Sequence, residues 1–184
     1  MAPIKSNNPV ASYFDFFSRS GTDAVAPAPV SGLTATGGVI SDYESGGVNY
    51  RAHVFTSSGA FNVTDLGNIA STVDYLVIGG GASGAFGGGG GGAGGYRSSV
   101  TGENSGGGGS AESSISYPIT VGGGGAATFA PSRPGKAGTA SVFSTITSQG
   151  GGGGGGEGED GTNGGSGGGA GGGAGSTFAG GTAN

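Results

Sequence analysis

The chain contains the stretch Val73-Asp74-Tyr75-Leu76-Val77-Ile78-Gly79-Gly80-Gly81-Ala82-Ser83-Gly84, in which a β-forming run breaks abruptly into glycine. The same junction recurs where residues 119–121 precede the glycines at 122–125, and where residues 146–149 precede the glycines at 150–156. Branched and aromatic side chains favour strands, whereas glycine weakens them. The pattern therefore predicts short strands that lead into long glycine tracts.

The segment from Gly79 to Gly84 also matches the dinucleotide-binding fingerprint G-x-G-x-x-G. That motif requires a helix directly after its last glycine, because the helix N-terminus holds the pyrophosphate. Here Ala85 and Phe86 are followed by six consecutive glycines, and each glycine costs a helix about 1 kcal/mol relative to alanine. The match is therefore attributed to glycine enrichment, and no cofactor is expected.

Composition excludes several classes of function. The 184 residues include 51 glycines, no cysteine and one histidine, His53, and the net charge is -5. A net negative chain with six scattered basic residues does not fit binding to nucleic-acid phosphates.

The longest apolar run, residues 75–78, is too short to span a membrane, and the N-terminus lacks the apolar region of a secretory signal. The segment 155–160 matches the start of one calcium-binding nonapeptide repeat, but a single copy is weak evidence for a calcium site. Neither an enzyme nor a metal site is expected.

Residues 1–31 are predicted to form an extended N-terminal arm and linker, because four prolines favour extended geometry. Four aromatic residues, Tyr13, Phe14, Phe16 and Phe17, lie within five positions of this arm. Such a cluster is typical of a linear anchor that buries its rings in another protein. The alternative is that the rings pack on the chain's own β-domain.

Residues 32–149 are predicted to form a small β-domain with glycine-rich insertions. Residues 50–56 and 60–64 are expected to pair as a hairpin around the turn at 57–59. Residues 73–78, apolar on both faces, are expected to form a central strand. Pro118 indicates an edge or bulged position for the strand at residues 115–121. Further strands are expected at residues 38–43, 95–100 and 142–147. The fold class is therefore all-β, a small sandwich or jelly-roll-like domain without significant helix.

The glycine tracts, including the C-terminal tract of residues 150–184, are either disordered or packed as polyglycine II helices. Polyglycine II has three residues per turn and no internal hydrogen bonds, so neighbouring helices must supply the partners. Its sequence requirement is one face of pure glycine with a three-residue period. Every third residue from Gly152 to Gly167 is glycine, which favours the ordered packing.

Several segments together resemble a known family. They are residues 53–63 (His-Val-Phe-Thr-Ser-Ser-Gly-Ala-Phe-Asn-Val), 73–81, 94–98 (Gly-Gly-Tyr-Arg-Ser), 117–122 and 141–147. In this order they are similar to the glycine-rich domain of structural proteins from marine bacteriophages. Residues 2–17 also resemble the N-termini of such virion proteins. More distantly, the chain is similar to the polyglycine II receptor-binding adhesins of T-even-like phages.

The resemblance implies a tail-fibre or adhesin role on the surface of the virion, after synthesis in the host cytoplasm without a signal peptide. The implied partners are other virion proteins through the N-terminal arm, further copies in a homo-oligomer such as a trimer, and a host receptor. In the T-even-like adhesins, recognition resides in loops between glycine helices. The corresponding candidates here are Thr101, Glu103, Asn104, Thr128, Phe129, Arg133 and Lys136.

Two alternatives remain open at this stage. One is a protein that decorates the capsid or tail without binding a receptor, and the other is a free polyglycine II protein that binds ice or another surface. Because the sequence stops within its glycine pattern, we also expect that the natural chain continues past Asn184.

Overall fold

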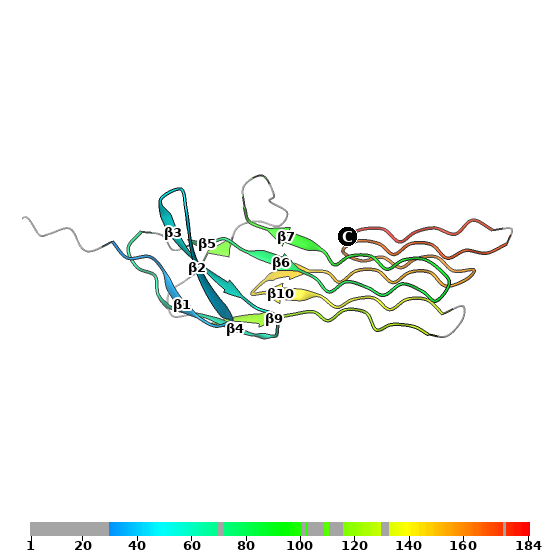
Figure 1. Ribbon diagram of the computed structural model, residues 1–184, viewed down its shortest axis with the longest axis horizontal. Coiled ribbons are helices and arrows are strands. Elements are labelled where there is room, and N and C mark those ends of the chain that lie inside the picture. The colour runs from blue at the N-terminus through cyan, green and yellow to red at the C-terminus, as the bar shows by residue number, and fades with distance from the viewer. Residues whose placement is uncertain are drawn as a thin grey trace, which may run out of the picture. The chain divides into compact units, whose positions relative to one another are not determined.

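The structure is a computed structural model that describes residues 30–69, 72–100, 102, 109–110, 116–129, 133–174 and 176–184. The chain divides into two units, Met1–Val30 and Ser31–Asn184, and the description below concerns the second. All regular secondary structure in the described ranges is β, and no helix occurs there (Figure 1). The prediction of an all-β fold without significant helix is confirmed.

Short strands, paired in one larger sheet and three small ones, make up the β-domain. The strands are β1 (Thr34–Thr36), β2 (Val39–Ser45), β3 (Val48–Val54), β4 (Gly59–Asp65), β5 (Thr72–Val73), β6 (Leu76–Ile78), β7 (Tyr96–Ser98), β8 (Gly109–Ser110), β9 (Ser116–Thr120), β10 (Ser141–Phe143) and β11 (Ile146–Ser148). Five strands form a sheet in the order β1-β4-β9-β10-β11, and the others pair as β2–β3, β5–β8 and β6–β7. Every pairing among these strands is antiparallel.

The apolar core of the β-domain is small. Its buried members are Ala35, Phe61 and Val63, which form one cluster, together with Tyr75 and Val77. The rings of Tyr117 and Phe143 pack against Phe61 with centroid separations of 6.3 Å. So small a core buries little apolar surface for a unit of this length, and much of the remaining order must come from backbone hydrogen bonds.

The predicted hairpin between residues 50–56 and 60–64 is wrong. All seven residues of β3 pair with the seven of β2, whereas β4 pairs with β1 and β9. Across β2 and β3 the rings of Tyr43 and Tyr50 stack, with their centroids 5.3 Å apart. β4 instead buries its apolar residues in the core, so tertiary packing overrides the proximity of β3 and β4 in the sequence.

The prediction that residues 73–78 form one central strand is also wrong. The segment is divided between β5 and β6, and β6 pairs with β7 alone among the described strands. The division lies at Asp74 and Tyr75. There the Ser99 hydroxyl donates to the Asp74 carboxylate at 2.9 Å and accepts from the Tyr75 N–H at 2.8 Å, which replaces ladder bonds.

The region from β9 to β11 corrects two further expectations. β9 is not an edge strand, because it lies between β4 and β10. β10 pairs only with Ile119 and Thr120, so that ladder begins after Pro118, which has no N–H to donate. Residues 142–147, predicted as one strand, contain parts of β10 and β11 joined by a tight turn with Ser144 at a φ of 54°.

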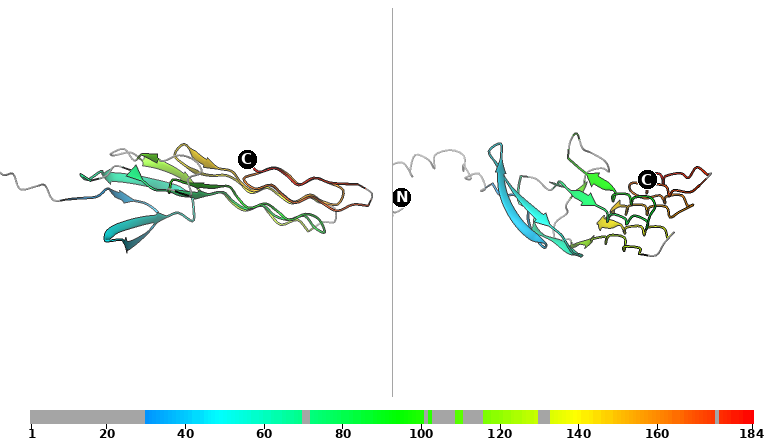
Figure 2. Two further views of the ribbon diagram at one scale, coloured as in Figure 1. Left: turned by 90° about the horizontal axis from the view of Figure 1, so that it is seen from above. Right: turned by 45° about the vertical axis from the view of Figure 1, so that its right-hand side comes forward.

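Strands β6, β7, β9, β10 and β11 continue directly into extended glycine-rich tracts, which extend away from the sheets (Figures 1 and 2). We call these tracts together the glycine bundle. They comprise residues 79–85, 89–95, 122–129, 133–140, 149–156, 159–165, 166–173 and 178–184. Hydrogen bonds between tracts join residues distant in sequence, so residues 150–184 pack with the tracts that follow β6, precede β7 and precede β10.

The hydrogen bonds of the glycine bundle repeat every three residues. The pattern is clear between tracts 89–95 and 149–156: Gly89 donates to Gly155, Gly92 to Gly152 and Gly95 to Gln149, at 2.7–2.8 Å. From the other sides of tract 149–156, Gly151 and Gly154 donate to residues 80 and 83, and Gly152 and Gly155 donate to residues 166 and 169. One extended tract is thus hydrogen-bonded to neighbouring tracts on several sides, as polyglycine II packing requires. The prediction of polyglycine II-like tracts is confirmed.

Close approach of the tracts, rather than backbone dihedrals, requires glycine here. Residues 151–156 are all buried and none has a positive φ. A Cβ built on Gly154 would nevertheless overlap the backbone carbonyl of Gly89. The single glycine face predicted from Gly152 to Gly167 is divided among three tracts, because the chain reverses at Gly158, with a φ of 77°, and again near residue 165.

Candidate functional site: the distal turns of the glycine bundle

Four turns of the glycine bundle lie at its end remote from the sheets (Figure 1). We call them the distal turns: residues 86–88, residues 128–129 with 133–134, residues 157–158, and residue 174 with 176–177. Each turn connects a tract that leads away from the sheets to one that returns. The periodic packing of the tracts therefore carries four segments that are distant in sequence to one end of the molecule's second unit.

Backbone hydrogen bonds fix the distal turns relative to one another. The Gly89 N–H donates to the Gly155 carbonyl at 2.8 Å, next to the turns at 86–88 and 157–158. The Gly135 N–H donates to the Gly154 carbonyl at 2.8 Å, and the Gly158 N–H donates to the Gly172 carbonyl at 2.9 Å. The four turns thus rest on a common hydrogen-bonded base, which is the preorganisation that a recognition surface requires.

Aromatic side chains are exposed at these turns. Phe129 is 82% exposed and Phe86 is 50% exposed. Phe178 is half-buried, and its ring lies beside Gly158 and Gly173, so it covers one turn instead of projecting from it. Exposed rings on a rigid base offer large contact area at low entropic cost.

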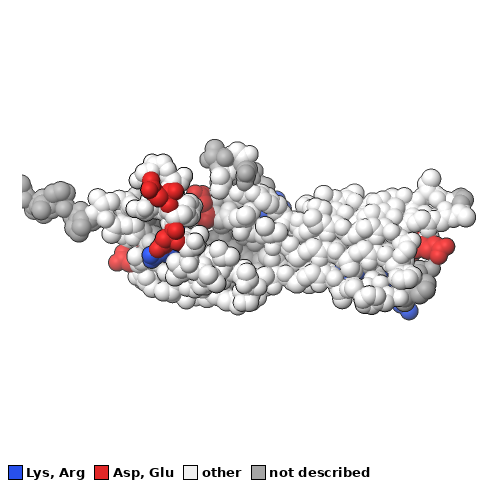
Figure 3. Space-filling view, viewed as in Figure 1, with Lys and Arg blue, Asp and Glu red and all other residues white. Residues whose placement is uncertain are grey.

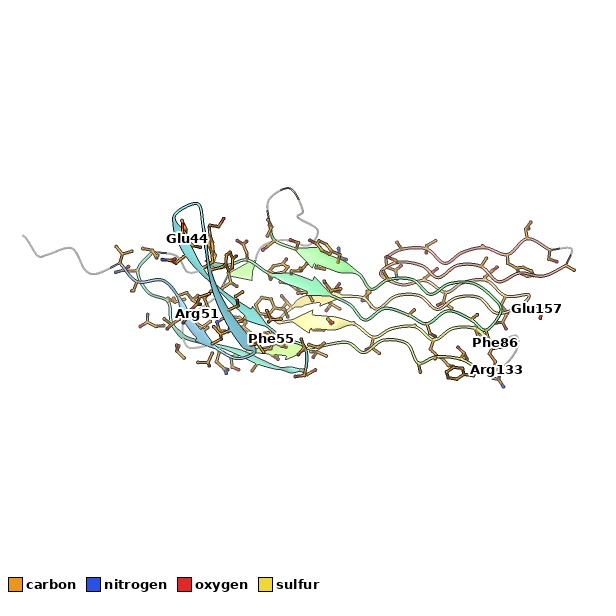
Figure 4. The ribbon with its side chains drawn as sticks, viewed as in Figure 1. Glu44, Arg51, Phe55, Phe86, Arg133 and Glu157 are labelled. Carbon is orange, nitrogen blue, oxygen red and sulfur yellow. The ribbon has the colours of Figure 1, made fainter. Side chains whose placement is uncertain are left out.

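All charged residues of the glycine bundle lie at or near the distal turns. The sequence of the eight tracts and their turns contains Arg133, Lys136, Glu157, Glu159 and Asp160 as its acidic and basic residues. Figure 4 shows Phe86, Arg133 and Glu157 at this end, and Figure 3 shows the acidic group at the tip beside uncharged bundle walls. The distal turns therefore combine rings, bases and acids, whereas the tracts behind them present backbone and small side chains.

The candidate residues predicted from the sequence divide into three groups. Phe129 and Arg133 are exposed at the distal turns, and Lys136 is exposed in the tract just behind them. Thr128 has a structural contact there, because its hydroxyl donates to the Pro134 carbonyl at 3.2 Å and links the two sides of its turn. The others lie outside the described residues: Thr101, Glu103, Asn104, Tyr13, Phe14, Phe16 and Phe17.

Two residues of the distal turns escaped the sequence analysis, Phe86 and Glu157. Phe86 is a lone aromatic between glycine tracts, and Glu157 begins an acidic group between glycine tracts. A large or charged side chain that interrupts a tract marks a turn, since it has no room inside the packing. That signal could have identified both residues.

The remaining motifs have structural surroundings. No helix follows Gly84; residues 79–84 pack against tracts 122–125 and 149–154 instead. Asp160, in the nonapeptide-like segment, accepts a hydrogen bond from the Ala179 N–H at 2.7 Å. The described ranges contain no cluster of three His, Cys, Asp or Glu side chains arranged to hold a metal ion. They also contain no helix with the length and apolarity to cross a bilayer.

The region of the chain that is similar to a known family contains the strands β4–β11 and the whole glycine bundle. Residues 56–184 match the family model described as a glycine-rich domain, which covers more than half of the chain. No curated protein and no solved structure matches the chain. The matched region begins between β3 and β4, so the β2–β3 pair lies outside it. The chain belongs to the glycine-rich domain family.

Proposed function

We propose that the protein is a non-enzymatic structural component of a bacteriophage particle, a fibre or adhesin that presents its distal turns to the host surface. In this proposal the N-terminal aromatic segment attaches the chain to other virion proteins, and the chain self-associates. The protein is then located on the outside of the particle.

The observation that carries the proposal is the contrast between the glycine bundle and its end. The bundle has period-three hydrogen bonds and buried glycines, and its charged side chains are confined to the distal turns and the ends of the tracts that adjoin them. A backbone packed this closely is stiff, because interiors at high density cannot deform without loss of contacts. Exposed rings and charges are concentrated where the bundle ends, which is the arrangement expected of a spacer that carries a recognition surface.

The first test concerns recognition by the distal turns. Fluorescently labelled protein is incubated with cells of the host that supports the phage, and bound label is counted per cell. Phe129→Ser combined with Arg133→Ser is expected to reduce binding at least tenfold, since exposed aromatic and arginine side chains dominate binding energy at interfaces. Ile69→Ser, which removes an exposed apolar side chain among the sheets, serves as the matched control and is expected to bind as the parent does.

Two outcomes of that experiment decide the adhesin part of the proposal. Equal binding by the double variant and the control contradicts recognition by the distal turns. If neither the parent nor the variants bind cells, but the protein is detected on particles, the protein decorates the particle without binding a receptor.

The second test concerns attachment. Replacement of Phe14, Phe16 and Phe17 by alanine is expected to abolish incorporation into particles, because the rings supply the buried contact area of the anchor. Incorporation is measured by immunogold labelling of purified particles, and far-UV circular dichroism checks that the β-domain remains folded. Normal incorporation of the triple variant would remove the anchor from the proposal.

A further inference from the structure

The two faces of the β2–β3 hairpin differ sharply in chemistry. Residues opposite each other in an antiparallel pair share a face. One face, here called the uncharged face, carries no Asp, Glu, Lys, Arg or His, whereas the other carries every charged residue of the hairpin. The uncharged face consists of Val39, Ser41, Tyr43, Ser45, Val48, Tyr50, Ala52 and Val54. The charged face includes Asp42, Glu44, Arg51 and His53.

The charged face is already satisfied. The Arg51 Nε donates to the Asp42 Oδ1 at 2.7 Å and the Nη2 donates to the Oδ2 at 2.9 Å. Both side chains remain in contact with water. This face therefore needs no further partner.

The uncharged face is exposed despite its apolar side chains. Val39 is 67% exposed, Tyr43 53%, Tyr50 44% and Val54 49%. The charged face carries the hairpin's ring contact to the core: the His53 Nδ1–H donates to the Gly37 carbonyl at 2.7 Å, and its ring meets Phe61 edge-on at 5.1 Å. A two-stranded hairpin is marginally stable by itself in water, so a partner on the uncharged face would stabilise it.

A second unpartnered apolar surface lies beside the base of the hairpin. A groove of about 520 Å³ runs between β3, β6 and the strands β9 and β10. Its walls include Val54 and the half-exposed Leu76 and Ile78, and its floor includes Val142 and Phe143. The uncharged face of the hairpin is apolar, as is most of the groove, whose lining also includes Arg51, His53 and Asp74. One copy of the chain carries both surfaces.

We propose that the β2–β3 hairpin of one copy packs its uncharged face over the apolar groove of a second copy. This inference deepens the self-association included in the proposed function and rests on it. The size of the surfaces supports a pairing that uses both. The uncharged face offers on the order of 400 Å², about the largest patch of an ordinary monomer. A stable interface needs about 800 Å² from each partner, so the uncharged face alone is too small, and in a two-fold pair each copy contributes both its hairpin face and its groove.

Both surfaces belong to one chain. A second copy is therefore the occupant that supplies a groove for each hairpin in equal amount, as the two halves of a two-fold pair do. The hairpin, residues 39–54, precedes the region at 56–184 that matches the family model, whereas most of the groove lies inside it.

The chain's lack of cysteine allows a direct test by cross-linking. Tyr50→Cys on the uncharged face and Leu76→Cys in the groove are made as single variants of the full chain, one with a mass tag, and mixed with oxidised glutathione. The Tyr50→Cys and Leu76→Cys pair is expected to form disulfide-linked heterodimers at least tenfold faster than Glu44→Cys with Leu76→Cys. Glu44 is the matched control, because it lies at the same end of the hairpin on the charged face. Equal rates, or cross-links mainly between two Tyr50→Cys chains, would overturn the inference.

Sedimentation velocity between 1 and 100 µM gives an independent readout. The parent is expected to associate, and Tyr43→Ser combined with Tyr50→Ser is expected to raise the dissociation constant at least tenfold, while Glu44→Gln, on the charged face and outside the groove, leaves it unchanged. Leu76→Ser, on the groove side, is expected to match the double variant, and circular dichroism checks folding. A parent that stays monomeric at 100 µM contradicts this inference. Because neither assay uses particles or cells, that result would leave the proposed attachment and recognition unaffected.

Discussion

Replacement of Gly154 by alanine tests whether the glycine bundle needs its missing side chains. Gly154 lies within the buried tract 149–156, and an added Cβ would overlap the carbonyl of Gly89. That carbonyl belongs to the backbone, which cannot rotate away as a side chain could. The tract must therefore shift from tract 89–95, at the expense of the bonds that link them, Gly92 to Gly152 at 2.7 Å and Gly89 to Gly155 at 2.8 Å.

The magnitude follows from these two effects. Overpacking of a dense interior costs about 1–3 kcal/mol. Each weakened buried hydrogen bond adds roughly 1 kcal/mol. The Gly154→Ala variant is thus expected to lose about 4 kcal/mol of unfolding free energy, which lowers the melting temperature by roughly 8–16 °C for a domain of this size.

Gly90→Ala is the matched control for that experiment. Gly90 belongs to a tract of the same bundle and its φ is not positive, but an added Cβ meets no atom within 4 Å. Alanine there restricts the unfolded chain, so the variant is expected to gain about 0.4–1 kcal/mol. Melting is followed by scanning calorimetry at one protein concentration. Similar melting temperatures for the two variants would refute the close packing of the tracts.

Two further predictions concern single hydrogen bonds. Asp160→Ala removes the acceptor of the Ala179 N–H, so hydrogen exchange of that amide is expected to accelerate about tenfold, for a bond of roughly 1.5 kcal/mol, whereas Glu159→Ala should leave it unchanged. The hydrogen bonds from Arg51 lower the pKa of Asp42 in the folded protein. Their stabilising effect is therefore fully present above the pKa of an unfolded aspartate, about 4, and is lost as the pH falls through the lowered pKa of the folded state. In Arg51→Gln the NMR titration midpoint of the Asp42 carboxyl is expected to rise toward about 4; an unchanged midpoint would contradict this.

The local features of the fold could be predicted from the sequence because their causes are local. The junction after Ile78 combines a β-forming run with glycine, and both the strand and the glycine tract occur there. The three-residue period of residues 150–184 is likewise a backbone requirement that leaves a trace in the sequence. Hence the fold class and the packing mode of the tracts followed from pattern alone.

Pairing partners could not be predicted, because they depend on contacts between distant segments. β4 pairs with β9, where Phe61 lies opposite Tyr117, and not with β3, the strand that precedes it in the sequence. Similarly, Phe86, Arg133 and Glu157 come together only because successive tracts have matching lengths, so that their turns lie at one end (Figure 4). The loop at residues 128–136 is predictable position by position from its own sequence, whereas the other turns that lie beside it are not.

Amide hydrogen exchange of the tract 149–156 tests the ordered packing of the glycine bundle most directly. If the tract is hydrogen-bonded on several sides, the amides of Gly152 and Gly155, which donate to residues 166 and 169, exchange only when the bundle opens. We predict that their exchange is slowed at least a thousandfold relative to an unstructured glycine peptide. Exchange of both amides within tenfold of the unstructured rate would contradict the account.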